Sequence, residues 1–284
     1  MRVLVTGARG QLGRDLVDAC ERAGDDVIAT DRSLLDIADR DAVLGAITTH
    51  RPSAVINASA YTAVDHCETN ADHAFLVNAL AVRHLAEACR LADAHLVHVS
   101  TDYVFSGEKA APYLEWDAPG PLGVYGASKL AGELEAQQAG IGATIVRTSW
   151  VCGEHGNNMV RTVLRVAAQP GPLRFVDDQH GCPTFTADLA PLIRRLAVER
   201  RPGVHHVTNQ RAVSWYGFVR EVMELAGHDP GRVEPITTAQ LQPPRPARRP
   251  ANSVLDNAVL RGSGIGLLAD FRGPLATLVK KLQA

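Results

Sequence analysis

The sequence of 284 residues has no excess of charge of either sign. Lysine and arginine together number 29 and aspartate and glutamate 31, which gives a formal net charge of −2. Nucleic-acid-binding proteins usually carry clustered basic residues, and proteins that bind anionic membranes carry polybasic segments. We therefore expect no nucleic-acid partner and no membrane partner, and a small molecule as the ligand.

Cysteine is scarce. The chain has 5 cysteines at scattered positions and no Cys-x-x-Cys pair. This pattern is typical of neither a disulfide framework nor a zinc site. We expect buried, reduced thiols and no bound metal.

Long hydrophobic runs are also missing. No window approaches the roughly 20 apolar residues that cross a bilayer, and Met1–Arg2 lead into a short apolar run and a glycine rather than into a secretory leader. We expect a cytoplasmic protein. Hydrophobic residues still make up 46% of the chain and charged residues 21%, a composition that supports a substantial folded core.

The sequence does contain short apolar runs that alternate with helical patterns. The runs are 3–5, 27–29, 54–56, 96–99 and 143–146. Their continuous apolarity indicates strands buried on both faces, and the segments between them show apolar residues at one-turn spacing. The alternation predicts an α/β fold of the Rossmann type, a doubly wound parallel sheet that binds ligands beyond the carboxyl ends of its strands.

The rhythm changes after Trp150. Helical patterns occur near 158–168, 187–199 and 215–226 with a short strand near 173–176, and the segment 243–250 holds too many prolines to be helical. We expect an NAD(P)-binding Rossmann domain over 1–150. Residues 151–284 would mainly form a smaller C-terminal substrate-binding lobe, with some chain returning to the Rossmann sheet.

A glycine-rich loop follows the first predicted strand and opens the first predicted helix. It reads Gly7-x-x-Gly10-x-x-Gly13 and includes Gln11 and Leu12. Glycines permit a tight turn and let backbone N–H groups approach a pyrophosphate, which the helix N-terminus also favours. The loop lacks the Gly-Lys-Ser/Thr of a P-loop, so we expect a dinucleotide rather than hydrolysis of ATP.

Residues after the second predicted strand bear on which dinucleotide binds. The carboxylate of Asp31 could accept the ribose hydroxyls of NAD, whereas Arg32 and Arg9 could receive the 2′-phosphate of NADP. The two indications conflict. We therefore expect NADPH or NADH without a stated preference.

Tyr125 and Lys129 are the strongest catalytic candidates. An i, i+4 pair projects both side chains from one face of the predicted helix before the fifth strand. The lysine ammonium and an oxidised nicotinamide would favour the phenolate and so bring the tyrosine proton within reach of transfer. Thr101, at the end of the fourth predicted strand, could donate a hydrogen bond to a reacting carbonyl oxygen.

With these residues the sequence resembles the extended short-chain dehydrogenase/reductase superfamily and, within it, the dTDP-4-dehydrorhamnose reductase family. The resemblance covers nearly the whole chain. It rests on the stretches 6–13, 57–65, 100–105, 125–129, 147–151, 178–184 and 249–253.

The resemblance implies that a hydride passes from NAD(P)H to the C4 ketone of a dTDP-4-dehydro-6-deoxyhexose. Tyr125 would be the proton donor, Lys129 its electrostatic partner and ribose anchor, and Thr101 the group that polarises the ketone. Further cofactor contacts are expected from Asp36, Ile37, Ala58, Ser59 and Ala60, with Asn78 on the cofactor side of the sheet. Substrate contacts are expected from Val64, Asp102, Tyr103, Trp150, Asn158, Arg249 and Asn252.

One difference from related dehydratases bears on the reaction, and two departures from the family pattern bear on the substrate. Tyr103 stands where related dehydratases carry a glutamate that serves elimination, so ketone reduction is favoured over dehydration. Ser106 and the pair His66-Cys67 are unusual, and we expect them near the sugar, where they leave the hexose open.

Other hypotheses remain open. The chain could be a dihydrostreptose-type or other deoxysugar 4-ketoreductase, a sugar-nucleotide epimerase, or a non-catalytic subunit similar to the β subunit of methionine adenosyltransferase. A monomer or a homodimer is expected. Some family members are metal-bridged dimers, but Ala187 stands where an acidic ligand would be needed, so no metal is predicted.

Overall fold

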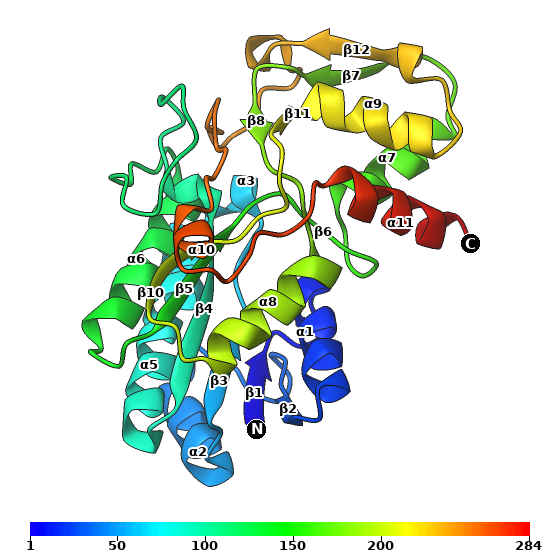
Figure 1. Ribbon diagram of the computed structural model, residues 1–284. Helices are drawn as coiled ribbons and strands as arrows, with labels where there is room; N and C mark the ends of the chain where they lie inside the picture. The colour runs from blue at the N-terminus through cyan, green and yellow to red at the C-terminus, as the bar shows by residue number, and fades with distance from the viewer.

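The computed structural model, which describes residues 1–284, is built around a central sheet of six parallel strands (Figure 1). In order across the sheet they are β2 (Asp26–Ala29), β1 (Arg2–Thr6), β3 (Ala54–Asn57), β4 (His95–Thr101), β5 (Thr144–Thr148) and β10 (Gly203–His206). The predicted fold class is confirmed. The chain order reverses between β1 and β3, and doubly wound sheets bind their ligands at such a point.

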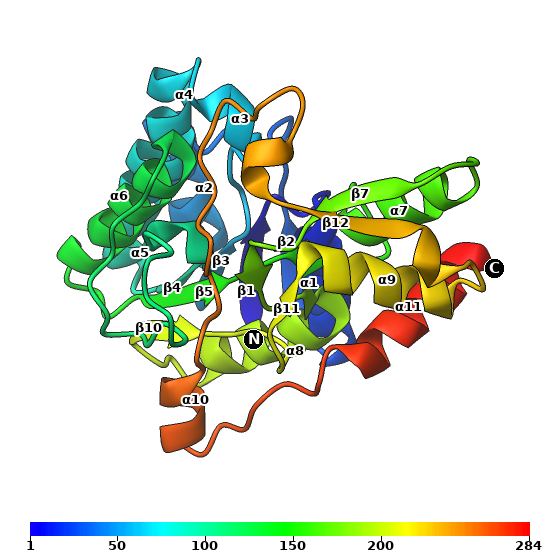
Figure 2. The same cartoon turned by 90° about the horizontal axis from the view of Figure 1, so that it is seen from above.

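Helices cover both faces of the sheet. One face carries α1 (Gln11–Arg22) and α8 (Thr186–Val198), and the other carries α2 (Arg40–His50), α5 (Ala81–Ala92) and α6 (Val124–Gln138) (Figures 1 and 2). Along β1, Val3 and Val5 pack into the first layer while Leu4 packs into the second. Burial on both faces explains why this strand is apolar at consecutive positions.

Short helices fill the connections at the carboxyl edge of the sheet. They are α3 (Val64–Cys67), α4 (Ala71–Phe75), the π-helical turn η1 (Leu76–Leu80) and the 3₁₀ turn η2 (Asp102–Val104). The π-helical turn joins α4 to α5 and contains Asn78. Such turns often mark functional positions.

The C-terminal lobe has its own core. Its longer elements are α7 (Met159–Ala167), α9 (Trp215–Leu225), α11 (Arg272–Gln283), and the parallel strands β7 (Leu173–Val176) and β12 (Val233–Ile236). Phe218, Val222, Phe271 and Leu275 pack together between these helices. The predicted helices and β7 are present, whereas β10, β12 and α11 are elements that the sequence patterns did not indicate.

The remaining elements are short. They are β6 (Val151–Cys152), β8 (His180–Gly181), β9 (Thr184–Phe185), β11 (Val213–Ser214), α10 (Ala258–Gly262), and the 3₁₀ turns η3 (Pro230–Arg232) and η4 (Thr238–Gln240). The proline-rich segment 243–250 contains no helix, as its prolines predict, and passes α3 on its way from β12 to α10 (Figure 2). All five cysteines are buried free thiols. The structure has no helix with the length and apolarity needed to cross a membrane.

Candidate active site

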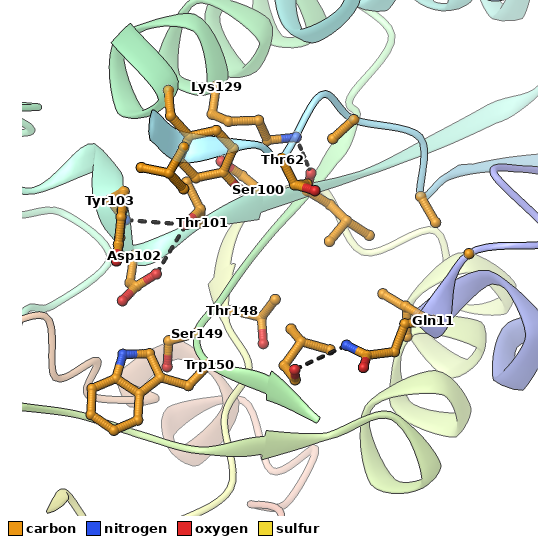
Figure 3. A pocket seen from close by; sticks show the side chains of 18 of the residues that line it. Gln11, Thr62, Ser100, Thr101, Asp102, Tyr103, Lys129, Thr148, Ser149 and Trp150 are labelled. Carbon is orange, nitrogen blue, oxygen red and sulfur yellow. Dashed lines mark hydrogen bonds between the residues drawn. The ribbon is translucent and has the colours of Figure 1, made fainter. Parts of the chain in front are cut away.

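A cavity of about 580 Å³ opens at the carboxyl edge of the sheet. Its lining includes Gly10–Leu12 from the glycine loop, the ends of β4 and β5, and Tyr125 and Lys129 from α6. Figure 3 shows Gln11 at one end of this cavity, and Asp102, Tyr103 and Trp150 at the other. The cavity therefore joins the predicted cofactor residues to the predicted substrate residues.

The glycine loop fits a diphosphate. Gly7 has φ +67°, and a Cβ on Gly13 would lie 2.0 Å from the carbonyl oxygen of Gly7, so neither position accepts a side chain. The N-cap of α1, Gly10, offers no side-chain acceptor to the first N–H groups of the helix. Those donors, together with the positive end of the helix dipole, suit the oxygens of a dinucleotide.

A second hollow of about 280 Å³ adjoins the loop and shares Gly10, Ala58 and Ala60 with the larger cavity. The other predicted cofactor residues that line it are Gly7, Asp31, Arg32, Asp36, Ile37 and Ser59. The structure thus brings together residues from three separate segments of the chain at one place. The hollow lies where the adenosine half of a dinucleotide would extend from the loop.

Asp31 is engaged on two sides within this hollow. The Ser33 hydroxyl donates to Asp31 Oδ1 over 2.5 Å, and Arg9 Nε lies 2.6 Å from Oδ2. The hydrogen bonds from Ser33 and the charge of Arg9 hold the pKa of Asp31 below its ordinary value. The conflicting indications for NAD and NADP therefore come from residues that bind each other.

Buried amides fix the segment Ala58–Ala60. Asn57 Oδ1 accepts from the Thr6 hydroxyl at 2.7 Å and from the N–H of Ser59 at 3.1 Å. Asn78 in turn holds both backbone groups of Tyr61, with Oδ1 2.8 Å from its nitrogen and Nδ2 3.1 Å from its oxygen. Asn78 thus holds the backbone next to the segment Ala58–Ala60, and its Nδ2 also donates to the hydroxyl of Ser128 on α6.

The N-terminus of the helix α6, which carries Tyr125 and Lys129, is capped by a side chain from another segment of the chain. Its N-cap residue, Gly123, has no side chain, and Glu68 Oε1 accepts the N–H of Val124 at 2.8 Å instead. A Cβ on Gly126 would lie 2.1 Å from the oxygen of Tyr103, and one on Gly132 2.1 Å from the oxygen of Asn78. These two glycines let α6 pack directly on the backbone beside the cavity.

Lys129 is 2% exposed, and its Nζ donates to the carbonyl oxygen of Val99 over 2.6 Å. Burial lowers the pKa of Lys129 to about 8, against the opposing charge of Glu133. An ammonium has three N–H donors, so two remain for the hydroxyls of a ribose. The position of Lys129 is compatible with the role expected for it.

Glu133, one turn after Lys129, anchors a buried ion pair beneath the site. Its carboxylate accepts from the Ser100 hydroxyl at 2.5 Å and from Arg147 Nη2 at 2.7 Å, and both charged side chains are 5% exposed or less. The pair links α6, β4 and β5. It therefore fixes the helix of Tyr125 and Lys129 against the strand that ends in Thr101.

Tyr125 faces the cavity as a neutral phenol. Burial raises its pKa well above the ordinary value, and the charge of Asp102 adds to the rise, whereas the Thr101 hydroxyl opposes it. The sequence predicts that the Lys129 ammonium and an oxidised nicotinamide together favour the phenolate. In the structure burial has the largest effect on the pKa of this phenol, and the effect of the two positive charges stays a prediction.

Thr101 and Asp102 form a small buried unit beside Tyr125. The Thr101 hydroxyl donates to Asp102 Oδ1 at 2.9 Å and accepts the N–H of Tyr103 at 3.2 Å. Asp102 Oδ2 is buried without a hydrogen-bond partner. Burial raises the pKa of Asp102 to about 6. This buried, unpaired oxygen of Asp102 is suited to accept a hydrogen bond from a hydroxyl group of a ligand.

Four predicted substrate residues line the cavity, namely Val64, Asp102, Tyr103 and Trp150. Asn158 does not. Its side chain accepts the N–H of Arg161 and so caps α7, and its Nδ2 donates to Gln11 Oε1 at 2.7 Å. Asn158 thus ties the lobe to the glycine loop.

Arg249 and Asn252 also lie outside the lining of the cavity. Arg249 forms a bidentate ion pair with Asp65 on α3, with Nη2 2.7 Å from Oδ2. Asn252 Nδ2 donates to the oxygen of Lys109 at 2.7 Å. Both side chains attach the segment around 243–253 to the Rossmann half.

Three residues that depart from the family pattern lie outside the lining of the cavity. Ser106, His66 and Cys67 do not line the cavity. Ser106 Oγ lies 3.5 Å from the hydroxyl of Tyr113, and Cys67 Sγ points to the oxygen of Tyr61 at 3.9 Å. Their place near a bound sugar stays a prediction.

Sequence reasoning missed several side chains of the site. Glu133 was detectable, because it continues the i, i+4 spacing from Tyr125 and Lys129. Glu68 and Trp215 had no such signal, since only the tertiary fold brings them to α6 and to the cavity. No cluster of three or more His, Cys, Asp or Glu side chains is placed to hold a metal ion. The absence of a resident metal stays a prediction.

Comparison with known proteins gives consistent results. The family model described as "RmlD substrate binding domain" matches residues 1–284. The chain is 45% identical over 279 residues to a probable dTDP-4,6-dihydroxy-2-methyloxan-3-one 4-ketoreductase of Streptomyces antibioticus, covering 97% of this chain and 93% of the relative. It is 43% identical over 281 residues to a dTDP-4-dehydrorhamnose reductase of Streptomyces griseus, covering 96% and 91%.

A solved structure agrees with the sequence comparisons. The dTDP-4-dehydrorhamnose reductase of Bacillus anthracis in complex with NADP superposes with a TM-score of 0.93 and 35% identity, covering 99% of both chains.

Proposed function

Because the chain belongs to the RmlD substrate binding domain family, we propose that it reduces the C4 ketone of a dTDP-4-dehydro-6-deoxyhexose, such as dTDP-4-dehydro-L-rhamnose, with NADPH or NADH. One observation carries the proposal. Thr101, Tyr125 and Lys129 line the same cavity as the glycine loop, so a ketone at its sugar end would lie between a proton donor and the cofactor.

The reduced nicotinamide, when bound, supplies the hydride that reduces the ketone carbon. Tyr125 holds the proton needed by the resulting alkoxide, since burial keeps the phenol neutral. Its Oη–H bond breaks as the new O–H bond forms on the oxygen attached to C4. The ammonium of Lys129 stabilises the phenolate left behind, and the Thr101 hydroxyl can donate to the same substrate oxygen.

The environment of Tyr103 favours reduction over dehydration. Burial raises its pKa to about 12, and its ring meets that of Tyr125 edge to face at 5.7 Å. Tyr103 carries no carboxyl group, so the side chain that serves elimination in related dehydratases is missing at this position. The cytoplasmic location and the monomeric or homodimeric state remain predictions, as do the roles of the individual site residues.

The test is a turnover assay with purified protein. Addition of dTDP-4-dehydro-L-rhamnose should remove the absorbance of the reduced nicotinamide. Tyr125→Phe should lower kcat by about 100-fold or more while leaving NADPH affinity unchanged, which is the loss expected for a general acid. Tyr216→Phe is the matched control, because that phenol does not line the cavity and its ring contacts Arg220 on α9.

Two outcomes would contradict the proposal. Interconversion of sugars without net consumption of the cofactor would indicate an epimerase. No turnover with either cofactor, together with a stable complex with a synthetase, would indicate a regulatory subunit.

A further inference from the structure

Two tryptophans from different halves of the molecule stack on each other at the cavity. Trp150 follows β5, Trp215 opens α9 in the lobe, and both line the cavity. Their ring centroids are 3.5 Å apart and their planes differ by 5°. Figure 3 shows Trp150 at the same end as Asp102 and Tyr103.

The Trp150 indole is held in one position. Its backbone has φ +45°, a left-handed conformation that is costly for a bulky residue and persists only where the surroundings enforce it. A Cβ on Gly181 would lie 2.5 Å from Cε2 of the indole, so this approach requires glycine. The Trp215 ring packs on the same indole and completes its support. Strain of this kind often accompanies a ligand-binding role.

The sugar end of the cavity therefore has two kinds of wall. Thr101 and Asp102 offer a hydroxyl and a carboxyl, whereas Trp150 and Trp215 offer aromatic carbon. A 6-deoxyhexose is divided in the same way, with hydroxyl groups on the ring and a methyl group at C5. Each indole has one polar group, the Nε1–H at its edge. A hydroxyl added to the methyl group would lose its water against the carbon of the two rings without gaining a partner there.

We propose that Trp215 is a specificity-determining residue, which holds Trp150 in place and receives with it the C5 methyl group of the sugar. The inference rests on the proposed function, because it takes the ligand to be a dTDP-hexose. An apolar pocket rejects an added hydroxyl by up to about 100-fold. Because the two indoles form only one wall of the cavity, we expect the 6-deoxy sugar to be preferred over its 6-hydroxy counterpart by about tenfold.

The experiment measures binding rather than turnover. dTDP-L-rhamnose and dTDP-L-mannose differ only in the C6 hydroxyl, and their Kd values are determined by calorimetry without NADP⁺, so that the reverse reaction cannot run. We expect the wild type to bind the 6-deoxy compound about tenfold more tightly. Trp215→Leu should abolish this preference and Trp215→Phe should retain most of it, while both variants keep the wild-type affinity for NADP⁺. A wild-type ratio in Trp215→Leu, or no preference in the wild type, would overturn the inference.

A second measurement does not depend on the folding of Trp215→Leu. The chain has 3 tryptophans, and the third, Trp116, is 69% exposed and outside the cavity. In Trp116→Phe the tryptophan emission comes only from the stacked pair. Addition of dTDP-L-rhamnose should then change the emission more than addition of dTDP-L-mannose does, and equal responses would refute the inference. If dTDP-sugars bind with this preference but no nicotinamide is oxidised, the proposed function fails and the inference stands.

Discussion

Asp102 should destabilise the folded protein at neutral pH. The residue is 2% exposed, one carboxyl oxygen accepts the Thr101 hydroxyl, and the other has no hydrogen-bond partner. The hydroxyls of Ser253 and Thr101 oppose the rise of the pKa of Asp102, but burial outweighs them. Ionisation of such a group costs free energy in the folded state that it does not cost in the unfolded chain. The substitution Asp102→Asn removes the charge and keeps the shape.

The sign and the size of the effect follow from the pKa of Asp102. Burial raises it from 3.8 to about 6, so the folded protein binds this proton more tightly than the unfolded chain does. The stability due to the proton is therefore complete below about pH 4 and is lost as the pH rises through 6. The difference between the two pKa values corresponds to about 3 kcal/mol, which is the largest loss expected at pH 7 and above.

The assay is urea unfolding of the wild type and Asp102→Asn between pH 4.5 and 8, without ligands. The difference in unfolding free energy should rise with pH in favour of the variant and level off above pH 7. Other titrating groups cancel, because they are common to both proteins. Asp117→Asn is the control, because a hydrogen bond from Lys109 lowers the pKa of Asp117 and the corresponding difference should be constant over this range. A constant difference for Asp102→Asn would refute the reasoning.

Three further predictions concern the support of the site and the cofactor. Glu133→Gln should lower the free energy of unfolding by about 3–5 kcal/mol, because it leaves the buried guanidinium of Arg147 unpaired. Glu135→Gln, in an exposed ion pair, should lower it by about 1 kcal/mol or less, and urea unfolding compares the two variants. Gly13→Ala should abolish NADPH binding in calorimetry, because the new Cβ would lie 2.0 Å from the carbonyl oxygen of Gly7, and binding by this variant would contradict the loop geometry. Gly45→Ala is the control: its Cβ would meet nothing within 4 Å on α2, and it should stabilise the protein by about 0.5–1 kcal/mol. Arg9→Ala should raise the KM for NADPH by about tenfold and leave that for NADH within about twofold, because a guanidinium binds a phosphate through charge-assisted hydrogen bonds; equal changes in steady-state assays would exclude that role.

The first half of the chain was predictable because local patterns there agree with the tertiary fold. Strands buried on both faces are apolar at consecutive positions, as in Val3–Val5, and the glycine loop lies between a strand and an amphipathic helix. The Tyr125 and Lys129 spacing likewise depends only on the helix that carries them. Each of these features is determined within one or two elements.

The second half was less predictable because its elements depend on distant partners. The strand β10 contains His205 and His206, which are polar, yet both are buried where β10 pairs with β5. Arg249 looked like a phosphate ligand because its partner Asp65 lies 184 positions away in sequence. Neither arrangement leaves a periodic signal in the sequence.

The chemical state of the site also lies beyond a motif. The spacing of Tyr125 and Lys129 identifies the pair. It does not indicate that burial keeps the phenol protonated, or that the ammonium donates one N–H to the carbonyl oxygen of Val99. Glu133 has two effects on the pair. Its bonds to Ser100 and Arg147 position the helix that carries Tyr125 and Lys129, and its charge raises the pKa of Lys129 against the effect of burial. Loss of that charge should therefore deprotonate Lys129 at lower pH. The alkaline limit of kcat in Glu133→Gln should move to lower pH, and an unchanged limit would show that the ion pair only holds the fold.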